Sequence, residues 1–442
     1  MRREFGPLLK LAGPVVLGEI GWMAMGIVDT LMVAPLGPAA IGATGIASGV
    51  ITTITIFGMG LMLGLDSLVS RAHGAGDQEE CLRWLYNGVW LALGVTPLLL
   101  VVTALVYATL DGWGLHPEIH ALVRPYLRVA ALGALPLLGY ATFRRYLQGM
   151  HMVRPIMIAL VSANLVNAAG NWLLIQGHLG FPALGIVGSA WATLGARVYM
   201  ATFLLVAIRR IHQDRGDEHP AVGRAVDWGR VRQLVALGLP AATQITLEVG
   251  AFAAVTALAG MLDPISSGSH QIALNVASLA FMVPLGIASA GAVRVGHALG
   301  AGDGRRAAHA GWAAMAVGAG VMTAIGAVFL LVPALILRGF SVDPRVLHLG
   351  TTLLAIAAAF QLFDGAQAIT TGILRGAGDT RTPMVANVIG HWFVGLPVGY
   401  VLCFRRGWGV PGLWTGLSVG LVFVSIVLTA TWARASRTMR HA

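Results

Sequence analysis

Long apolar runs recur from one end of this chain to the other, and they constrain its fold more than any other feature. Crossing the hydrocarbon core of a bilayer takes about 20 apolar residues in a helix. Because lipid offers the backbone no hydrogen bonds, runs of this length must be helical. Only 11% of the residues are charged, against about 25% in soluble domains. The sequence therefore predicts an all-α, polytopic membrane protein.

The apolar pattern predicts twelve transmembrane helices joined by short connections. The connection at 209–232 is the exception, since it is long and charged. The predicted helices cover 8–33, 40–69, 85–107, 120–147, 155–177, 185–209, 231–258, 269–299, 307–337, 346–374, 383–404 and 410–433.

The basic residues gather on one side of the predicted membrane segments. An even number of helices puts both termini on the same side, and that side holds most of the Lys and Arg residues. The other side holds only Arg338, Arg345, Arg405 and Arg406. By the positive-inside rule both termini are cytosolic, in an inner membrane. The rule also explains the net charge of +10, so no nucleic-acid partner is expected.

The chain repeats itself. The interval between the matching segments is 226 residues, as from Asp77 to Asp303, and 227 for the last pair. The matching segments are SRAHGAGD (70–77) with RVGHALGAGD (294–303), LAGP (11–14) with LGLP (237–240), and LQGMHMVRPIM (147–157) with LRGAGDTRTPM (374–384).

The repeat predicts two pseudo-symmetric lobes of six helices each. The expected parts are an N-terminal lobe at 1–208, a cytosolic linker at 209–232 and a C-terminal lobe at 233–442. Six helices per lobe give both lobes the same orientation, a plan typical of secondary transporters that bind substrate between repeats. The alternative is that duplication only enlarged a membrane scaffold.

Three acidic residues lie deep within the predicted helices: Asp29, Glu248 and Asp364. A carboxylate at the bilayer centre costs about 2.5–3.5 kcal/mol on insertion scales, so such residues mark a cavity, a partner or a bound cation. Two further acids, Glu19 and Asp66, lie nearer helix ends, and Asp66 is expected to be structural.

Both acids of the C-terminal half have polar neighbours at helical spacing. Residues three and four apart share a helix face. Gln361 and Gln367 lie three residues to either side of Asp364, and Gln244 lies one turn before Glu248. Two other predicted helices of the same half add the pairs Gln271 with Asn275 and Asn387 with His391, each four residues apart. Carboxylates, amides and a histidine inside one bundle indicate a site for a proton or for Na⁺, and the sequence leaves the choice open. A Na⁺ site would lie at Glu248 and Asp364.

Asp29 belongs to the other half, where Asn164, Asn167 and Asn171 follow one another at spacings of three and four residues in one predicted helix. These asparagines are candidates for a second polar site around Asp29. Hydrogen bonding between helices is the alternative role, since such bonds occur in membrane bundles.

Several motifs resemble the multidrug and toxic compound extrusion (MATE) family, in particular its NorM-like bacterial branch. The resemblance covers roughly 8–430. The motifs are GIVDTLMVAPLG, GLDSLVSRAHGAGD, LEVGAFA, LAFMVPLGIASAGAVRVGHALGAGD and FDGAQAITTGILRGAGDTRTPM.

This resemblance implies a twelve-helix antiporter of two lobes that exports cationic, amphipathic drugs and dyes in exchange for Na⁺ or H⁺. It assigns coupling roles to Asp29, Glu248 and Asp364 and a supporting role to the asparagine pair Asn167 and Asn171. One position departs from the pattern, because Phe360 stands where some Na⁺-using relatives are expected to carry a tyrosine.

Two other functions stay open. A flippase for lipids or lipid-linked oligosaccharides would belong to the same superfamily, but it would need a basic cleft, and the buried charges here are mostly acidic. A non-transporting scaffold or receptor is the alternative from another class. No enzyme motif and no nucleotide-binding motif occur. We therefore expect no cofactor beyond the coupling ion, small organic cations and the lipid bilayer as partners, and a functional monomer.

Overall fold

The computed structural model describes residues 2–214, 223, 225–340 and 343–441, and in these ranges it contains helices and no strand. This confirms the all-α prediction. The main helices are α1 (Arg2–Val33), α2 (Pro38–Leu61), α3 (Gly64–Gly74), α4 (Gln78–Thr109), α5 (Pro117–Leu132), α6 (Ala134–Gly149), α7 (Arg154–Gln176), α8 (Ile186–Asp214), α9 (Trp228–Gly260), α10 (Pro264–Gly300), α11 (Gly304–Leu331), α12 (Pro333–Arg338), α13 (Pro344–Gly376), α14 (Arg381–Val388), α15 (Leu396–Tyr400) and α16 (Val410–His441).

The described helices account for the predicted membrane crossings. Among the described residues, eleven helical segments are long and apolar enough to span a bilayer. The bent pair α5 and α6, which turns by 42°, supplies a twelfth when it is counted as one span. The protein is therefore a multi-span membrane protein with the predicted number of helices.

Some predicted helices are interrupted. The segment 40–69 divides into α2 and α3 at Met62, and 307–337 divides into α11 and α12 at Val332. Pro333 explains the second break, because proline has no N–H to continue a helix but is well suited to begin one. The segment 383–404 contains two π-helical stretches, η4 (Ile389–Gly395) and η5 (Val401–Arg405).

Packing divides the chain into two compact units. Unit 1 contains Met1–Val16 and Thr243–Ala442, and unit 2 contains Leu17–Ala242. Helices α1 and α9 therefore each contribute to both units. The two points of division, after Val16 and after Ala242, are related by the same interval of 226 residues as the sequence repeat. The lobe boundary at 209–232 stays a prediction, and its residues 215–222 and 224 lie outside the described ranges.

Two equivalent glycines allow the first half of α1 to pack in unit 1 and the first half of α9 to pack in unit 2. In unit 1 a Cβ atom on Gly286 would lie 2.9 Å from Cα of Val16, and in unit 2 a Cβ atom on Gly60 would lie 2.5 Å from Cα of Ala242. Only glycine permits backbones to approach this closely. The first half of α1 thus packs on α10, and the first half of α9 packs on α2.

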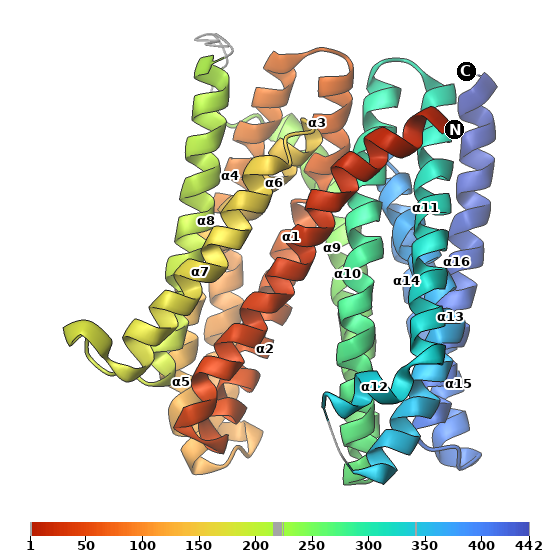
Figure 1. Cartoon of the computed structure of the whole chain (residues 1–442). Coiled ribbons are helices and arrows are strands. Elements are labelled where there is room, and N and C mark those ends of the chain that lie inside the picture. The colour runs from red at the N-terminus through yellow and green to blue at the C-terminus, as the bar shows by residue number, and fades with distance from the viewer. Residues whose placement is uncertain (1, 215–222, 224, 341–342, 442) are drawn as a thin grey trace. The chain divides into compact units, whose positions relative to one another are not determined.

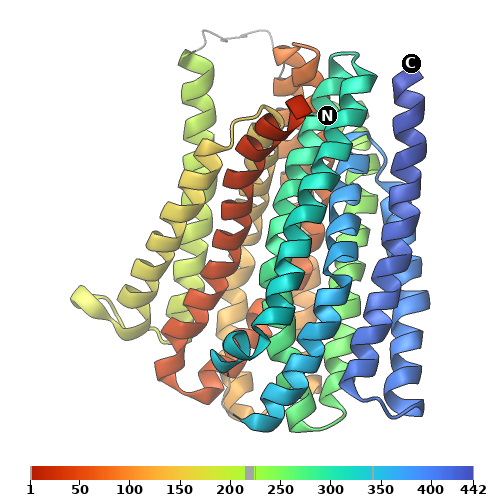
Figure 2. The same cartoon turned by 45° about the vertical axis from the view of Figure 1, so that its right-hand side comes forward.

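Within unit 1, α10, α11, α13 and α16 lie side by side (Figures 1 and 2). The start of α1 and the end of α16 lie at the same end of this unit (Figure 1). Their position agrees with an even number of spans between them.

Candidate functional site

Asp29 lies in unit 2, surrounded by hydrogen-bond donors. Its Oδ1 accepts from Nδ2 of Asn167 at 3.0 Å and from Nδ2 of Asn171 at 2.7 Å. Its Oδ2 accepts from the hydroxyl of Thr193 on α8 at 2.9 Å. Asp29 is only 8% exposed. Three helices, α1, α7 and α8, thus position one buried carboxylate with its acceptor capacity largely satisfied.

Two of the three asparagines predicted around Asp29, Asn167 and Asn171, bond to it. Thr193 was missed, because a single threonine in an apolar helix carries no spacing signal. Arg197, one turn further along α8, supplies a positive charge near enough to interact with Asp29. Asn164 has a different role, since its Nδ2 donates to the backbone oxygen of Gly21 at 3.1 Å and so joins α7 to α1.

The acids of unit 1 lie in a polar cluster that spans three helices. Nε2 of Gln367 on α13 donates to Oδ1 of Asn387 on α14 at 2.9 Å and lies 3.5 Å from Oε1 of Glu248 on α9. Gln244, one turn before Glu248, also lies close to that carboxyl group. Glu248 is half-buried, whereas Gln367 and Asn387 are buried. The cluster therefore links α9 to α13 and α14 through side chains.

Asp364 lies on α13, three residues before Gln367, and is 8% exposed. Its charge interacts with that of Glu248. Among the described residues no hydrogen bond to its carboxylate is found. Asp364 therefore differs from Asp29, because burial removes it from water without supplying donors in return.

Several buried polar atoms around these acids also have no hydrogen-bond partner within the described part of the chain. They are Nε2 and Oε1 of Gln361, Oε1 of Gln367, the hydroxyls of Thr370 and Thr371, and both ring nitrogens of His391. Each unsatisfied buried group costs about 1–3 kcal/mol. A cluster of them beside two acids is suited to binding water together with a cation.

Among the described residues, two of the predicted side chains have no hydrogen bond to this cluster. Gln271 and Asn275 are exposed on α10, where Nε2 of Gln271 donates to Oδ1 of Asn275 at 3.3 Å. Phe360 is buried, with its ring centroid 6.0 Å from that of Trp414 on α16. Phe360 therefore contributes apolar packing.

The acids predicted nearer helix ends pair with arginines of α6. Glu19 pairs with Arg144, and Oδ2 of Asp66 lies 3.4 Å from Nη1 of Arg145. These pairs belong to unit 2 and satisfy their charges within it.

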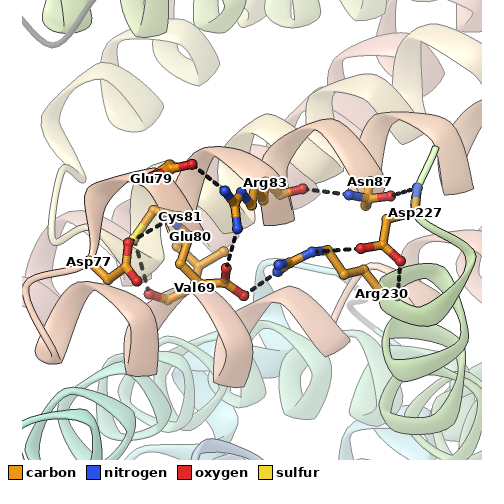
Figure 3. A network of polar contacts seen from close by, with 9 residues as sticks. All are labelled: Val69, Asp77, Glu79, Glu80, Cys81, Arg83, Asn87, Asp227 and Arg230. Carbon is orange, nitrogen blue, oxygen red and sulfur yellow. Dashed lines mark hydrogen bonds and ion pairs between the residues drawn. The ribbon is translucent and has the colours of Figure 1, made fainter. Parts of the chain in front are cut away.

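A second kind of polar contact holds the starts of α1 and α9. In unit 2, Arg230 at the start of α9 pairs with Glu80 of α4 and with Asp227, whose backbone N–H donates to Asn87 (Figure 3). The backbone N–H of Arg230 in turn donates to Asp227 and lowers the pKa of that exposed carboxyl group. The start of α9 is thus tied to α4 by both charge and hydrogen bonds.

In unit 1, Glu4 at the start of α1 pairs with Arg294 of α10 and with Arg306 of α11, the latter at 3.2 Å. The repeat interval relates Glu4 to Arg230 and Glu80 to Arg306. The two units therefore contain equivalent ion pairs in which the signs of the charges are exchanged.

Comparison with known proteins identifies the family. The MatE family model matches residues 14–173 and 240–401. The "Probable multidrug resistance protein NorM" of Mesorhizobium japonicum is 36% identical over 99% of this chain and 95% of its own length. The "Multidrug resistance protein PmpM" of Pseudomonas aeruginosa is 33% identical over 99% of this chain and 93% of its own.

Solved structures share the fold. The eukaryotic MATE transporter AtDTX14 superposes with a TM-score of 0.87 at 20% identity, covering 99% of this chain and 98% of its own. A multidrug resistance MATE family transporter of the MOP superfamily, in an outward-facing conformation, gives a TM-score of 0.86 at 19% identity over 99% and 96% of the two chains. The family model matches both halves of the sequence, and the relatives match nearly its whole length. The chain therefore belongs to the MatE family of membrane transporters.

Proposed function

We propose that this protein is a multidrug efflux antiporter, which exports cationic, amphipathic small molecules in exchange for H⁺ or Na⁺. Its relatives NorM and PmpM are named as multidrug resistance proteins. The observation that carries the proposal is the pair Glu248 and Asp364, two interacting acids among unsatisfied amides within membrane-spanning helices. Intramembrane acids of this kind are typical of ion and substrate pathways.

The chemistry of the cluster explains how exchange can be enforced. Two neighbouring carboxylates with few donors strongly favour a bound positive charge, whether a coupling ion or a cationic substrate. If the coupling ion and the substrate cannot bind at the same time, binding of the ion releases the substrate. The gradient of the ion then drives export. A ligand shifts a conformational equilibrium only by its differential affinity for the two states, and the neutralisation of buried charge supplies that difference.

The remaining features belong to the same proposal. The protein lies in the bacterial inner membrane with both termini cytosolic, as the distribution of basic residues indicates. It acts as a monomer and as a transporter, and it needs no cofactor besides the coupling ion. Asp29, supported by Asn167 and Asn171, forms a second polar site that takes part in coupling together with Glu248 and Asp364.

Dye efflux from proteoliposomes tests this proposal. Asp364→Asn and Glu248→Gln remove one charge each at nearly constant volume, so both should abolish gradient-driven efflux while the proteins still fold. Asp263→Asn is the matched control, because Asp263 is exposed at the start of α10 and accepts from the N–H groups of Ile265 and Ser266. Asparagine caps a helix equally well, so this variant should transport normally. Normal efflux by both cluster variants would remove the site.

A further inference from the structure

Two buried histidines of unit 1 have opposite surroundings. Nδ1 of His270 lies 3.0 Å from Nε1 of Trp414, and Nε2 lies 2.9 Å from the hydroxyl of Thr256. The indole N–H can only donate, so Nδ1 accepts and carries no proton. The Thr256 hydroxyl donates to the backbone oxygen of Phe252 at 3.0 Å, so its oxygen can accept from Nε2–H. His270 is thus a neutral, fully satisfied ring that joins three helices.

His391 is equally buried, with 0% exposure, yet neither ring nitrogen has a hydrogen-bond partner in the described part of the chain. Packing alone does not account for an imidazole in this condition, since unsatisfied buried groups are costly. His391 also lies in the π-helical stretch η4. Single π-turns within α-helices occur frequently at functional sites.

The backbone around His391 is fixed beside Glu248. Nε1 of Trp392, the next residue, donates to the backbone oxygen of Leu247 at 2.9 Å. The ring of His391 lies 6.1 Å from that of Phe252, which follows Glu248 by one turn on α9. Two short connections therefore hold η4 against the turn of α9 that carries the acid.

Hydrogen-bonded side chains also connect the helical turn before His391 to Glu248. Asn387 precedes His391 by four residues, accepts from Gln367, and through it reaches Glu248. On α9 the nearest titratable group to this turn is Glu248, whereas Arg230 and Arg232 lie at the start of the helix, and His270 meets α9 at Thr256, one turn beyond Phe252. On α13, Asp364 lies three residues before Gln367, whereas Arg345, His348 and Arg375 lie near the two ends of that helix. On the opposite side, α16 presents apolar Phe423 and Val424 to Gly390. Arg381 and Arg405 lie at the two far ends of the segment that contains η4.

Building on the proposed function, we infer that His391 is a proton-accepting group of this site and restricts the coupling ion to H⁺. A neutral imidazole offers one nitrogen lone pair and one N–H, and chains of Asp, Glu and His carry protons in transporters. The ring nitrogens of His391 suit H⁺ and not Na⁺, because a hard cation such as Na⁺ prefers oxygen ligands.

In this scheme one proton enters the site for each cationic substrate that leaves it. A proton from outside adds to the free ring nitrogen of His391 and forms an imidazolium ion, whose charge Glu248 and Asp364 compensate. A cationic substrate that arrives at those acids from the cytosol raises the local positive charge, so the imidazolium ion returns its proton to water on that side. No other bond forms or breaks.

The test compares wild type, His391→Asn and His391→Gln in proteoliposomes under a pH gradient or a Na⁺ gradient alone. Wild type should export dye with the pH gradient and not with the Na⁺ gradient, and both variants should lose most pH-driven efflux. In weakly buffered detergent, dye binding to wild type should release about one more proton per dye molecule than binding to the variants. His348→Asn is the control, because His348 is exposed on α13, and it should match wild type in both assays.

The outcomes separate the two proposals. If neither gradient drives wild-type efflux, the antiporter proposal itself fails. If the Na⁺ gradient alone drives it, antiport stands and the inference about His391 is overturned. It is also overturned if a folded His391→Asn or His391→Gln variant keeps wild-type proton release and efflux. Thermal unfolding shows which of the two variants is folded. The glutamine variant is included because its longer side chain fills space that asparagine would leave empty.

Discussion

At the scale of single residues, the buried acids of the two units differ in how much of their hydrogen-bonding capacity is satisfied. Asp29 accepts from three donors, whereas no donor to Asp364 is found in the described ranges. A carboxylate with its acceptors satisfied can remain in place through a transport cycle. One without donors depends on what binds to it, so Asp364 is the better candidate for the group that exchanges its cation.

The donors of Asp29 can be tested one at a time. Thr193→Val removes one hydroxyl at constant shape and leaves Oδ2 of Asp29 without that donor. We expect a loss of about 1–3 kcal/mol of stability, measured by unfolding in detergent. Thr193→Ser keeps the hydroxyl and should recover most of the loss. A valine variant as stable as wild type would show that water replaces the threonine without cost.

At the scale of elements, the starts of α1 and α9 occupy equivalent positions in the two units. The start of α1 contributes the acid of its ion pair, Glu4, and the start of α9 contributes the arginine, Arg230. The two pairs differ in burial. The side chains of Glu4 and Arg294 are 10% and 8% exposed, and those of Glu80 and Arg230 are 25% and 19% exposed. Arg230 also keeps Asp227 as a second partner. Removing the acid should therefore be more costly at α1 than at α9.

Glu4→Gln and Glu80→Gln test this difference directly. The first leaves Arg294 buried without its partner, and loss of one member of a buried pair costs about 3–5 kcal/mol. The second leaves Arg230 paired with Asp227, so we expect about 1 kcal/mol or less. Thermal unfolding of both variants in one detergent gives the comparison. Equal destabilisation would mean that burial does not distinguish the two pairs.

The sequence predicted the helices well, because apolar length and spacing depend on local composition. It also grouped Asp29 with Asn167 and Asn171, since the asparagines share a helix face. It did not separate Gln271 and Asn275 from the buried cluster, because a polar face looks the same in sequence whether it lines a site or the surface. The break at Met62 and the contact of Thr193 depend on neighbouring helices, which the local sequence does not specify.

At the scale of the whole molecule, α1 and α9 are the helices that run from one unit into the other. Pro14 and Pro240 lie two residues before the points of division and match each other in the repeat. Proline removes an intrahelical hydrogen bond and weakens a helix by about 3 kcal/mol. Any relative movement of the units during transport must be absorbed in these helices, and the prolines mark where they bend most easily.

Pro14→Ala and Pro240→Ala should stiffen the two helices. We expect efflux to slow while dye affinity stays near that of wild type, because the alanines restore a backbone hydrogen bond and leave every side chain of the acidic cluster in place. Initial rates in proteoliposomes and dye binding in detergent measure the two effects. Unchanged rates in the double variant would show that bending occurs elsewhere.

The exchanged signs of the Glu4 and Arg230 contacts make the two halves of this repeated chain complementary in charge to each other, but not to themselves. A first half that met a copy of itself would bring Glu4 against Glu80, and a second half would bring Arg230 against Arg306. Both homotypic assemblies would place like charges together, and only the mixed one places opposite charges together. If the halves were produced as separate polypeptides, these charges would favour the pairing of a first half with a second half over the pairing of two like halves.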